Sequence, residues 1–307
     1  MERGENRQTI RQGSARLLWV TILVLLLSGR AAAEPELCAR DALDQRLCLA
    51  EPATRIVALS PGATELLFSA GAGDSVLAVS AWSDYPPEAA ALPRVGDSNR
   101  LDLEGIVALA PDLVVAWVDG NSRSQLEKLA NLGIPVFWLA PRRFEDIAQS
   151  VEDLARLTGR PALGAEQAKD FRDGLARLRA EHADARPISV FYQIWDQPLM
   201  TVNREELISK AIGLCGGVNV FGDLPRLVPR VSTEAVLAAD PEAIVTSGRE
   251  DGDQAWLERW RRFPELTAVR TGNLFLEPPS LLVRPTLRML AGTRHLCDTL
   301  ERARGNL

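Results

Sequence analysis

The chain has 307 residues, 46% of them hydrophobic and 25% charged, with a formal net charge of −6. This balance excludes an intrinsically disordered chain, and the acidic surplus excludes the attraction through which proteins bind nucleic acid or anionic lipid. The length is enough for two domains that each bury a core.

The N-terminus has the order of a secretory signal peptide. Four arginines between Arg3 and Arg16 precede an apolar run from Leu17 to Leu27, and Ala31 to Ala33 follow. The run is shorter than the roughly 20 residues of a membrane-spanning helix, so we expect cleavage after Ala33 and export. The mature chain would keep 30 basic and 39 acidic residues, a formal charge of −9.

Four cysteines lie beyond the predicted cleavage site, at positions 38, 48, 215 and 297. An even number in an exported chain predicts disulfides, although the sequence alone permits three pairings. The residues from Cys38 to Cys48 have the pattern of a short hairpin that one disulfide could close, which would leave Cys215 and Cys297 as the second pair. The spacings match no zinc site, so no metal is expected.

Short apolar runs alternate with amphipathic stretches from Arg55 onward. This alternation predicts an α/β fold with mainly parallel sheets. The predicted strands are residues 56–59, 76–79, 113–117 and 136–139 in the first half, and residues 188–193, 243–246 and 274–276 in the second.

A repeated segment links the two halves. Residues 103–115 match residues 233–245 without a gap, and Glu104 and Glu234 hold the same place in it, two residues after the predicted helix caps. Because the flanking elements also correspond, the repeat predicts two similar lobes.

One long helix is predicted between the halves, at residues 161–186. Phe171, Leu175 and Leu178 fall on one side of it at helical spacing, and charged residues fill the rest. Such a helix would be a stiff connector. We therefore expect two Rossmann-like α/β lobes, residues 34–160 and 187–307, joined by a single long helix.

An enzyme is not expected, although Ser60 stands at a strand-to-helix turn that resembles the nucleophile elbow of serine hydrolases. A hydrolase also needs a general base, and the two histidines, His182 and His295, lie in the connector and in the C-terminal helical stretch. The simpler interpretation is that Ser60 caps a helix beginning at Pro61. An envelope serine hydrolase remains the alternative from another class.

Aromatic residues follow several predicted strands and have polar neighbours. Trp82, Tyr85, Trp117 and Trp195 would lie beyond the carboxyl ends of parallel strands, where α/β proteins bind ligands. We predict that they form a half-exposed binding face. The other tryptophans are predicted to be core residues: Trp19, Trp138, Trp256 and Trp260.

Several segments resemble periplasmic cobalamin-binding proteins, over roughly residues 50–300. The first half contains RIVALSPGATELLFSAG (55–71), SDYPP (83–87), DLEGIVALAPDLVVAW (102–117) and LGIPVFWL (132–139). The second half contains VFYQIWDQPLMTV (190–202), LCGGVNVF (214–221) and VSTEAVLAADPEAIV (231–245). RIVALSP is shared with haem- and siderophore-binding relatives, whereas SDYPP and the LCGG segment are more specific to cobalamin binders.

The resemblance implies a helical-backbone periplasmic binding protein, which holds a corrinoid between its lobes and delivers it to the membrane subunits of an ABC importer. Such a protein would be a monomer in the periplasm. The family's ligand contacts fall on Trp82, Trp117, Ile194 with Trp195, and Ser280 to Arg284.

The resemblance also implies two roles outside the cleft. Glu104 and Glu234 match glutamates that pair with arginines of the importer, and the family's disulfide falls on Cys215 and Cys297.

This chain departs from the family's pattern at the cleft. Ser98 and Val228 stand where similar proteins carry tryptophans, and Ile194 where they carry an aromatic residue. The cleft surface is therefore altered, and the sequence leaves the exact corrinoid open.

A haem or ferric-siderophore binding protein is the alternative within the same class. Tyr85 or Tyr192 could ligate haem iron, and Arg284 could meet an anionic chelate.

Overall fold

The structure is a computed structural model, and it describes residues 37–248, 254–278 and 280–307. The predicted signal peptide, its cleavage site and Trp19 lie outside the described residues. Residues 37–307 form one compact unit. Among the helices described, none has both the length and the apolar composition that crossing a bilayer requires.

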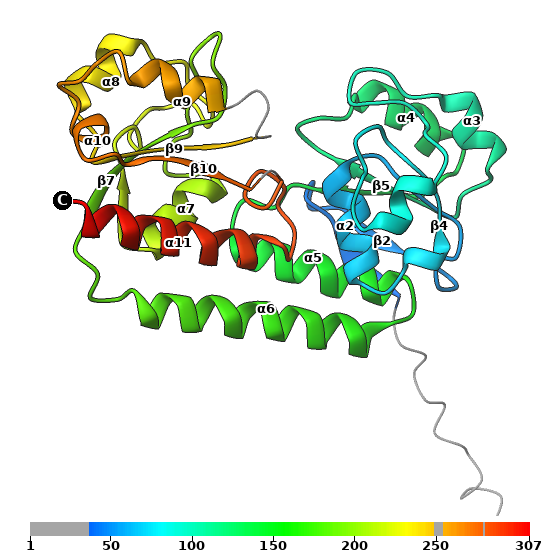
Figure 1. The fold of residues 1–307 in the computed structure, drawn as a ribbon. Coiled ribbons are helices and arrows are strands. Elements are labelled where there is room, and N and C mark those ends of the chain that lie inside the picture. Colours follow the sequence, from blue (N-terminus) through cyan, green and yellow to red (C-terminus); the bar gives the residue numbers. More distant parts are fainter. Residues whose placement is uncertain (1–36, 249–253, 279) are drawn as a thin grey trace, which may run out of the picture. The chain divides into compact units, whose positions relative to one another are not determined.

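The first lobe is built on a four-stranded parallel sheet in the order β4-β3-β5-β6 (Figure 1). Both faces of this sheet are covered, so its strands are almost continuously apolar. The elements are β3 (Ile56–Ala58), α2 (Pro61–Ser69), η1 (Gly73–Ser75), β4 (Val76–Val79), η2 (Pro87–Ala91), α3 (Leu103–Ala108), β5 (Leu113–Trp117), α4 (Arg123–Asn131), β6 (Val136–Leu139) and α5 (Phe144–Leu157).

The second lobe repeats this architecture, with a parallel sheet in the order β8-β7-β9-β10. When the strands of each sheet are numbered by their place in the sequence, both sheets have the spatial order 2-1-3-4. This shared order confirms the two similar α/β lobes. The elements are β7 (Ile188–Gln193), α7 (Leu207–Leu214), β8 (Gly217–Asn219), α8 (Thr233–Ala239), β9 (Ala243–Ser247), α9 (Gln254–Trp260), α10 (Thr267–Arg270), β10 (Leu274–Glu277) and α11 (Met289–Gly305).

An acid fixes the third strand to the first in both lobes. Asp112, just before β5, accepts the N–H of Arg55 at 3.0 Å, and Glu242, just before β9, accepts the N–H of Ser189 at 2.7 Å. These acids hold the same place in the repeated segment. The repeat thus corresponds to one structural device used twice: a short helix, a proline and an acid that sets strand register.

The connector is α6 (Pro161–Glu181), which runs along α5 and touches α11. Figure 1 shows it passing from the first lobe to the second. Phe171, Leu175 and Leu178 are buried in a core that also contains residues of both sheets. The helix ends five residues before the predicted boundary, because the chain turns after Glu181 on its way to Pro187, whose ring disfavours helix in the residue before it.

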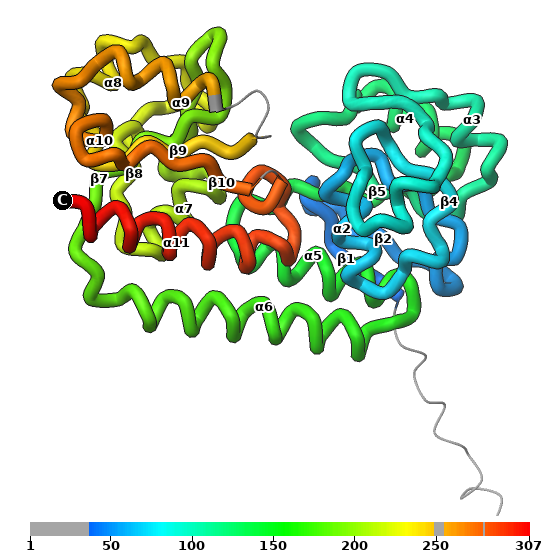
Figure 2. Tube along the Cα trace, in the orientation of Figure 1, coloured from blue at the N-terminus to red at the C-terminus, as the bar shows by residue number. Residues whose placement is uncertain are grey.

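A small antiparallel hairpin precedes the first lobe. It consists of β1 (Cys38–Arg40) and β2 (Arg46–Cys48), and the disulfide joins the directly paired residues Cys38 and Cys48. The N–H of Ala42 in its turn donates to the carbonyl of Trp138 in β6, at 2.8 Å. The hairpin therefore sits on the outer edge of the first sheet, with β1 against α5 (Figure 2).

The second disulfide joins Cys215, at the end of α7, to Cys297 in α11. Both cysteines are fully buried in the core shared by the two lobes. The pairing confirms the one that the family resemblance implies.

The strand pattern differs from the prediction at one place. β8 (Gly217–Asn219) was not predicted as a strand, because it is three residues long, follows Gly216 and begins with a second glycine, and glycine is a poor strand former. The other strands of the two sheets agree with prediction to within one residue.

Removing the disulfide between α7 and α11 should lower stability strongly, because it closes a long loop. A separation of 82 residues predicts a loss of about 4 kcal/mol in the unfolding free energy when Cys215 and Cys297 are both changed to Ser. Urea unfolding measures this loss. The matched double change at Cys38 and Cys48, which closes only 10 residues, should cost less, and an equal or smaller loss for the long loop would contradict the prediction.

Candidate functional site

Both sheets have a point at their carboxyl edge where the strand order reverses, between the first and third strands. Ligands of open α/β sheets bind beyond the strand ends at such points. In the first lobe this point lies between Ser60, which follows β3, and Trp117, the last residue of β5.

A cavity occupies this position. It measures about 200 Å³ and is enclosed by the start of α2, the ends of β5 and β6, and a segment that precedes α11. Figure 2 shows that segment, the orange coil between β10 and α11, reaching toward α2. The lining residues are Ser60, Pro61, Gly62, Ala63, Leu66, Trp117, Leu139, Pro141, Val283, Arg284 and Pro285.

Ser60 acts as the helix cap that was predicted. Its Oγ accepts the N–H of Ala63 at 3.1 Å, and Pro61 is the first residue of α2. The two histidines lie elsewhere, His182 bonded to Glu301 and His295 to Glu277. No histidine is therefore bonded to Ser60 as a general base.

The Trp117 indole is set in place by its own turn. Asn121 accepts the N–H of Trp117 at 2.7 Å and donates to the carbonyl of Leu59 at 3.0 Å, which ties the ends of β5 and β3 together. A Cβ at Gly120 would lie 2.1 Å from the indole, so only glycine allows this ring position. The ring is 38% exposed and faces the cavity.

Trp82 is held in a strained backbone conformation. Its φ is +66°, in the left-handed region that costs a residue other than glycine about 1 to 3 kcal/mol, and its side chain is 75% exposed. Its carbonyl accepts the N–H of Asp84 at 3.1 Å and Nη2 of Arg284 at 3.2 Å. Strain of this kind persists only where the surroundings enforce it, and here it presents a large apolar ring to solvent.

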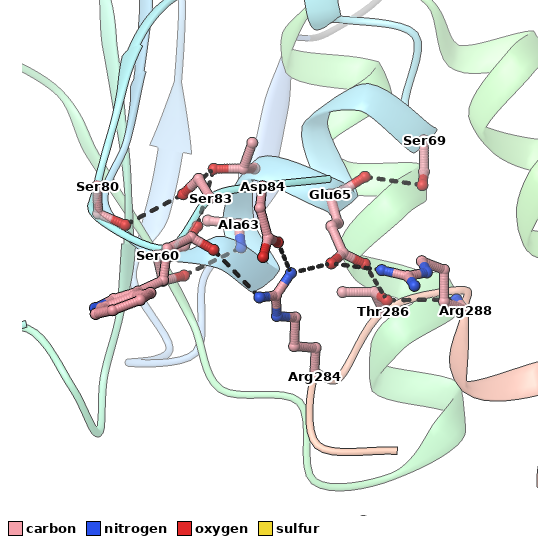
Figure 3. A network of polar contacts seen from close by, with 12 residues as sticks. Ser60, Ala63, Glu65, Ser69, Ser80, Ser83, Asp84, Arg284, Thr286 and Arg288 are labelled. Carbon is pink, nitrogen blue, oxygen red and sulfur yellow. Dashed lines mark hydrogen bonds and ion pairs between the residues drawn. The ribbon is translucent and has the colours of Figure 1, made fainter. Parts of the chain in front are cut away.

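Glu65 of α2 is the centre of a buried polar network (Figure 3). Its side chain is 2% exposed, and all its partners come from the segment before α11. Oε1 accepts from Arg284 at 2.9 Å and from Arg288 at 3.3 Å, and Oε2 accepts the hydroxyl of Thr286 at 2.8 Å. A buried carboxylate thereby fixes residues 284–288, from the second half of the chain, on the first lobe.

The network continues to the segment that follows β4. Nη1 of Arg284 also donates to Asp84 at 2.6 Å, and the guanidinium of Arg288 lies 3.8 Å above the centre of the Tyr85 ring. The hydrogen bond from Arg284 is the largest cause that lowers the pKa of Asp84 below its ordinary value of 3.8, so Asp84 is ionised at neutral pH. Two arginines therefore face two carboxylates.

The structure brings together some of the predicted site residues. Trp117 and Arg284 line the same cavity. Trp82 and Tyr85 lie beside it: the carbonyl of Trp82 accepts from Arg284, and the Tyr85 ring lies under Arg288. The structure does not place the other predicted contacts in or beside this cavity: Ile194, Trp195 and Ser280.

Those residues lie at the edge of the second lobe and beside β10. Trp195 is 54% exposed and packs edge-on against Trp256, which is only partly buried and so is not the core residue that was predicted. Ile194 is partly buried, and Ser280 has a φ of +67°. Trp138 and Trp260 are core residues, as predicted.

The two tyrosines differ sharply in environment. Tyr192 is fully buried and hydrogen-bonded to Ser247. Burial raises its pKa, which disfavours the phenolate that would ligate iron. Tyr85 is 42% exposed but lies under Arg288.

Sequence reasoning missed the residues around Glu65. The signal available for Glu65 was a charge inside the apolar run of α2, since Leu66 and Leu67 beside it are core residues. A buried acid needs a partner, so that charge implied a cation from elsewhere in the fold. Nothing in the sequence indicated that Arg284 and Arg288 would supply the cations, or that Thr286 would add a hydroxyl donor.

Substituting Gly120 by Ala should displace the Trp117 indole, because the added Cβ would overlap it. The ring is half-exposed and can move, so we expect weaker ligand binding, by roughly 1 kcal/mol or more, with the lobe still folded. Near-ultraviolet circular dichroism reports the displacement of the indole, and a binding titration reports the weaker ligand binding. Gly213→Ala in α7 is the control, because an added Cβ there meets no atom within 4 Å; equal behaviour of both variants would show that Gly120 does not fix the ring.

Comparisons with known proteins agree with this architecture. A family model described as periplasmic binding protein matches residues 56–281. The vitamin B12-binding protein of Vibrio parahaemolyticus is 37% identical over 251 residues, which are 82% of this chain and 90% of that protein.

Two solved structures have a similar fold. The crystal structure of the periplasmic vitamin B12-binding protein of Vibrio cholerae has a TM-score of 0.76 at 38% identity, covering 82% of this chain and 98% of that one. The periplasmic heme-binding protein RhuT of Roseiflexus has a TM-score of 0.72 at 23% identity, covering 81% and 98%, and shares the fold alone. The chain therefore belongs to the periplasmic binding protein family.

Proposed function

We propose that this protein captures cobalamin or a related corrinoid in the periplasm and delivers it to an ABC importer, acting as a monomer and without catalysis. One observation carries the ligand assignment: exposed tryptophans flank a cavity whose lining contains a single charged residue, Arg284, and that charge is already paired. The two disulfides suit an oxidising compartment such as the periplasm.

A corrin matches this surface chemically. It is a large, partly apolar ring with amide side chains, so it can be covered by indoles and reached by neutral hydrogen-bonding groups. The cavity, at about 200 Å³, holds only part of such a ligand. The rest would extend over the exposed ring of Trp82.

The haem and siderophore alternatives fit the site less well. Tyr192 is buried away from solvent, and Tyr85 is covered on one side by Arg288. Arg284 already bonds Glu65 and Asp84, so it is not free to meet an anionic chelate. The hydrolase alternative lacks a general base at Ser60.

A titration of the purified protein with cyanocobalamin tests the proposal directly. We expect quenching of tryptophan fluorescence and a shift in the corrin absorption spectrum with one ligand per chain. Haemin under the same conditions is the comparison. Preferential binding of haemin, or no binding of cyanocobalamin, would contradict the assignment.

Three single substitutions test which tryptophans touch the corrin: Trp82→Ala, Trp117→Ala and Trp195→Ala. Each should weaken cyanocobalamin binding by roughly 1 to 3 kcal/mol, because each removes a broad apolar contact. Unfolding free energies should change little, since all three side chains are substantially exposed. Leu132→Ala, at another exposed apolar position, serves as the control. If all three tryptophan variants bind normally, the ligand lies elsewhere.

Importer docking is assigned to Glu104 and Glu234. Both are exposed in the first turns of equivalent helices, α3 and α8, whose caps are Asp102 and Ser232 as predicted. Hydrogen bonds from its own backbone and from Ser232 lower the pKa of Glu234, which keeps it charged. Exposed acids of this kind govern docking rate and register more than ligand affinity.

The double variant Glu104→Ala with Glu234→Ala should bind corrinoid normally but fail to stimulate transport by the cognate importer in proteoliposomes. Asp74→Ala with Glu88→Ala removes the same charge from the first turns of η1 and η2 and should transport normally. Normal transport by the Glu104 and Glu234 variant would refute the docking role.

A further inference from the structure

The charges beside the cavity are balanced, and the balance is unusually complete for a site open to solvent. Arg284 and Arg288 are the cations, and Glu65 and Asp84 are their partners (Figure 3). The ion pairs in this group join opposite charges, and the other contacts of the two arginines and two carboxylates are to neutral groups, such as the carbonyl of Trp82 and the hydroxyl of Thr286.

We propose that Glu65 and Asp84 determine ligand specificity, excluding anionic ligands from the cleft by neutralising Arg284 and Arg288. The inference rests on the proposed function, because it concerns the choice between a corrinoid and its anionic rivals. It assigns a role to two carboxylates that need not touch the ligand.

The geometry leaves Arg284 little capacity for a ligand anion. Nη1 of Arg284 bonds both carboxylates, at 2.9 Å and 2.6 Å, and Nη2 bonds the carbonyl of Trp82. Its side chain is only 14% exposed. An incoming carboxylate would have to displace Asp84, a partner of equal charge that is already in place, so it would gain little.

The start of α2 does not restore an anion site. The first amides of a helix usually attract anions, but Pro61 has no N–H and the N–H of Ala63 is bonded to Ser60. Of the first three residues of α2, only Gly62 has an N–H that Ser60 does not occupy. The cavity therefore offers neutral polar groups and apolar surface.

The fold by itself does not decide between a corrinoid and haem, so the side chains of the cleft must do so. A heme-binding protein shares this fold with a TM-score of 0.72, so the two-lobed architecture does not exclude haem. Haem carries two carboxylates, and an uncompensated arginine beside an apolar cavity would bind them by charge-assisted hydrogen bonds. Charge balance at the cavity is a means by which the same fold can reject haem.

Asp84 is the residue whose substitution tests the proposal. Glu65 is buried, so its removal would leave unpaired cations inside the protein and disturb folding. Asp84 is 56% exposed at the rim. Asp84→Asn keeps the shape of the side chain and leaves Arg284 anchored to Glu65, but gives the cleft one uncompensated positive charge.

The test compares haemin and cyanocobalamin titrations of the unmodified protein, Asp84→Asn and Glu88→Gln. We expect Asp84→Asn to raise the ratio of haemin affinity to cyanocobalamin affinity at least fivefold. Glu88→Gln removes an equal charge four residues further along, at an exposed position, and should leave the ratio unchanged. A rise below fivefold in Asp84→Asn, or an equal rise in Glu88→Gln, overturns the inference.

A second readout needs no ligand. Iodide should quench the tryptophan fluorescence of Asp84→Asn more strongly than that of the unmodified protein, while neutral acrylamide quenches both equally. If cyanocobalamin does not bind but iodide quenches Asp84→Asn more strongly than the unmodified protein, the proposed function fails and the exclusion of anions by the two carboxylates stands. If cyanocobalamin binds but neither the haemin titration nor iodide quenching distinguishes Asp84→Asn from the unmodified protein, the exclusion of anions by the two carboxylates fails and the proposed function stands.

Discussion

The site depends on one buried carboxylate. Glu65 lies in α2, inside the core of the first lobe, and three side chains from more than 200 residues later satisfy it. Removing one partner of a buried ion pair typically costs about 3 to 5 kcal/mol, because the other charge is left buried and unpaired, so α2 and the segment 284–288 depend on each other. The covalent link through α6 is therefore not the only connection between the two halves.

The same interaction explains the position of the exposed tryptophan. Arg284, once anchored by Glu65, reaches Asp84 and the carbonyl of Trp82, and these bonds hold a backbone conformation that the residue would otherwise leave. Trp117 is placed by a different means, through Asn121 and the small Gly120. One indole is thus positioned by long-range electrostatics and the other by local turn geometry.

Most of the fold could be predicted from the sequence because its signals are local. Apolar runs, the repeat and the cap at Ser60 each depend on neighbouring residues, and the hairpin from Cys38 to Cys48 is equally local. The carboxyl-edge tryptophans also followed from strand position. The network around Glu65 could not be predicted, since its partners at Thr286 and Arg288 are brought near only by the folded chain. The pairing of Arg284 could not be predicted for the same reason, because its partners Glu65 and Asp84 are distant in sequence.

The hairpin on β6 has a consequence for the solubility of the chain. An edge strand with free backbone groups is a template on which a second molecule can add its own strand, the first step of many aggregation reactions. The bond from Ala42 to the carbonyl of Trp138 occupies that template within the molecule itself. Since each strand of the hairpin is only three residues long, its disulfide adds to the contacts with α5 and β6 that hold it there. Reduction of this disulfide would therefore loosen the cover of the β6 edge and expose backbone groups to which a second molecule could bind.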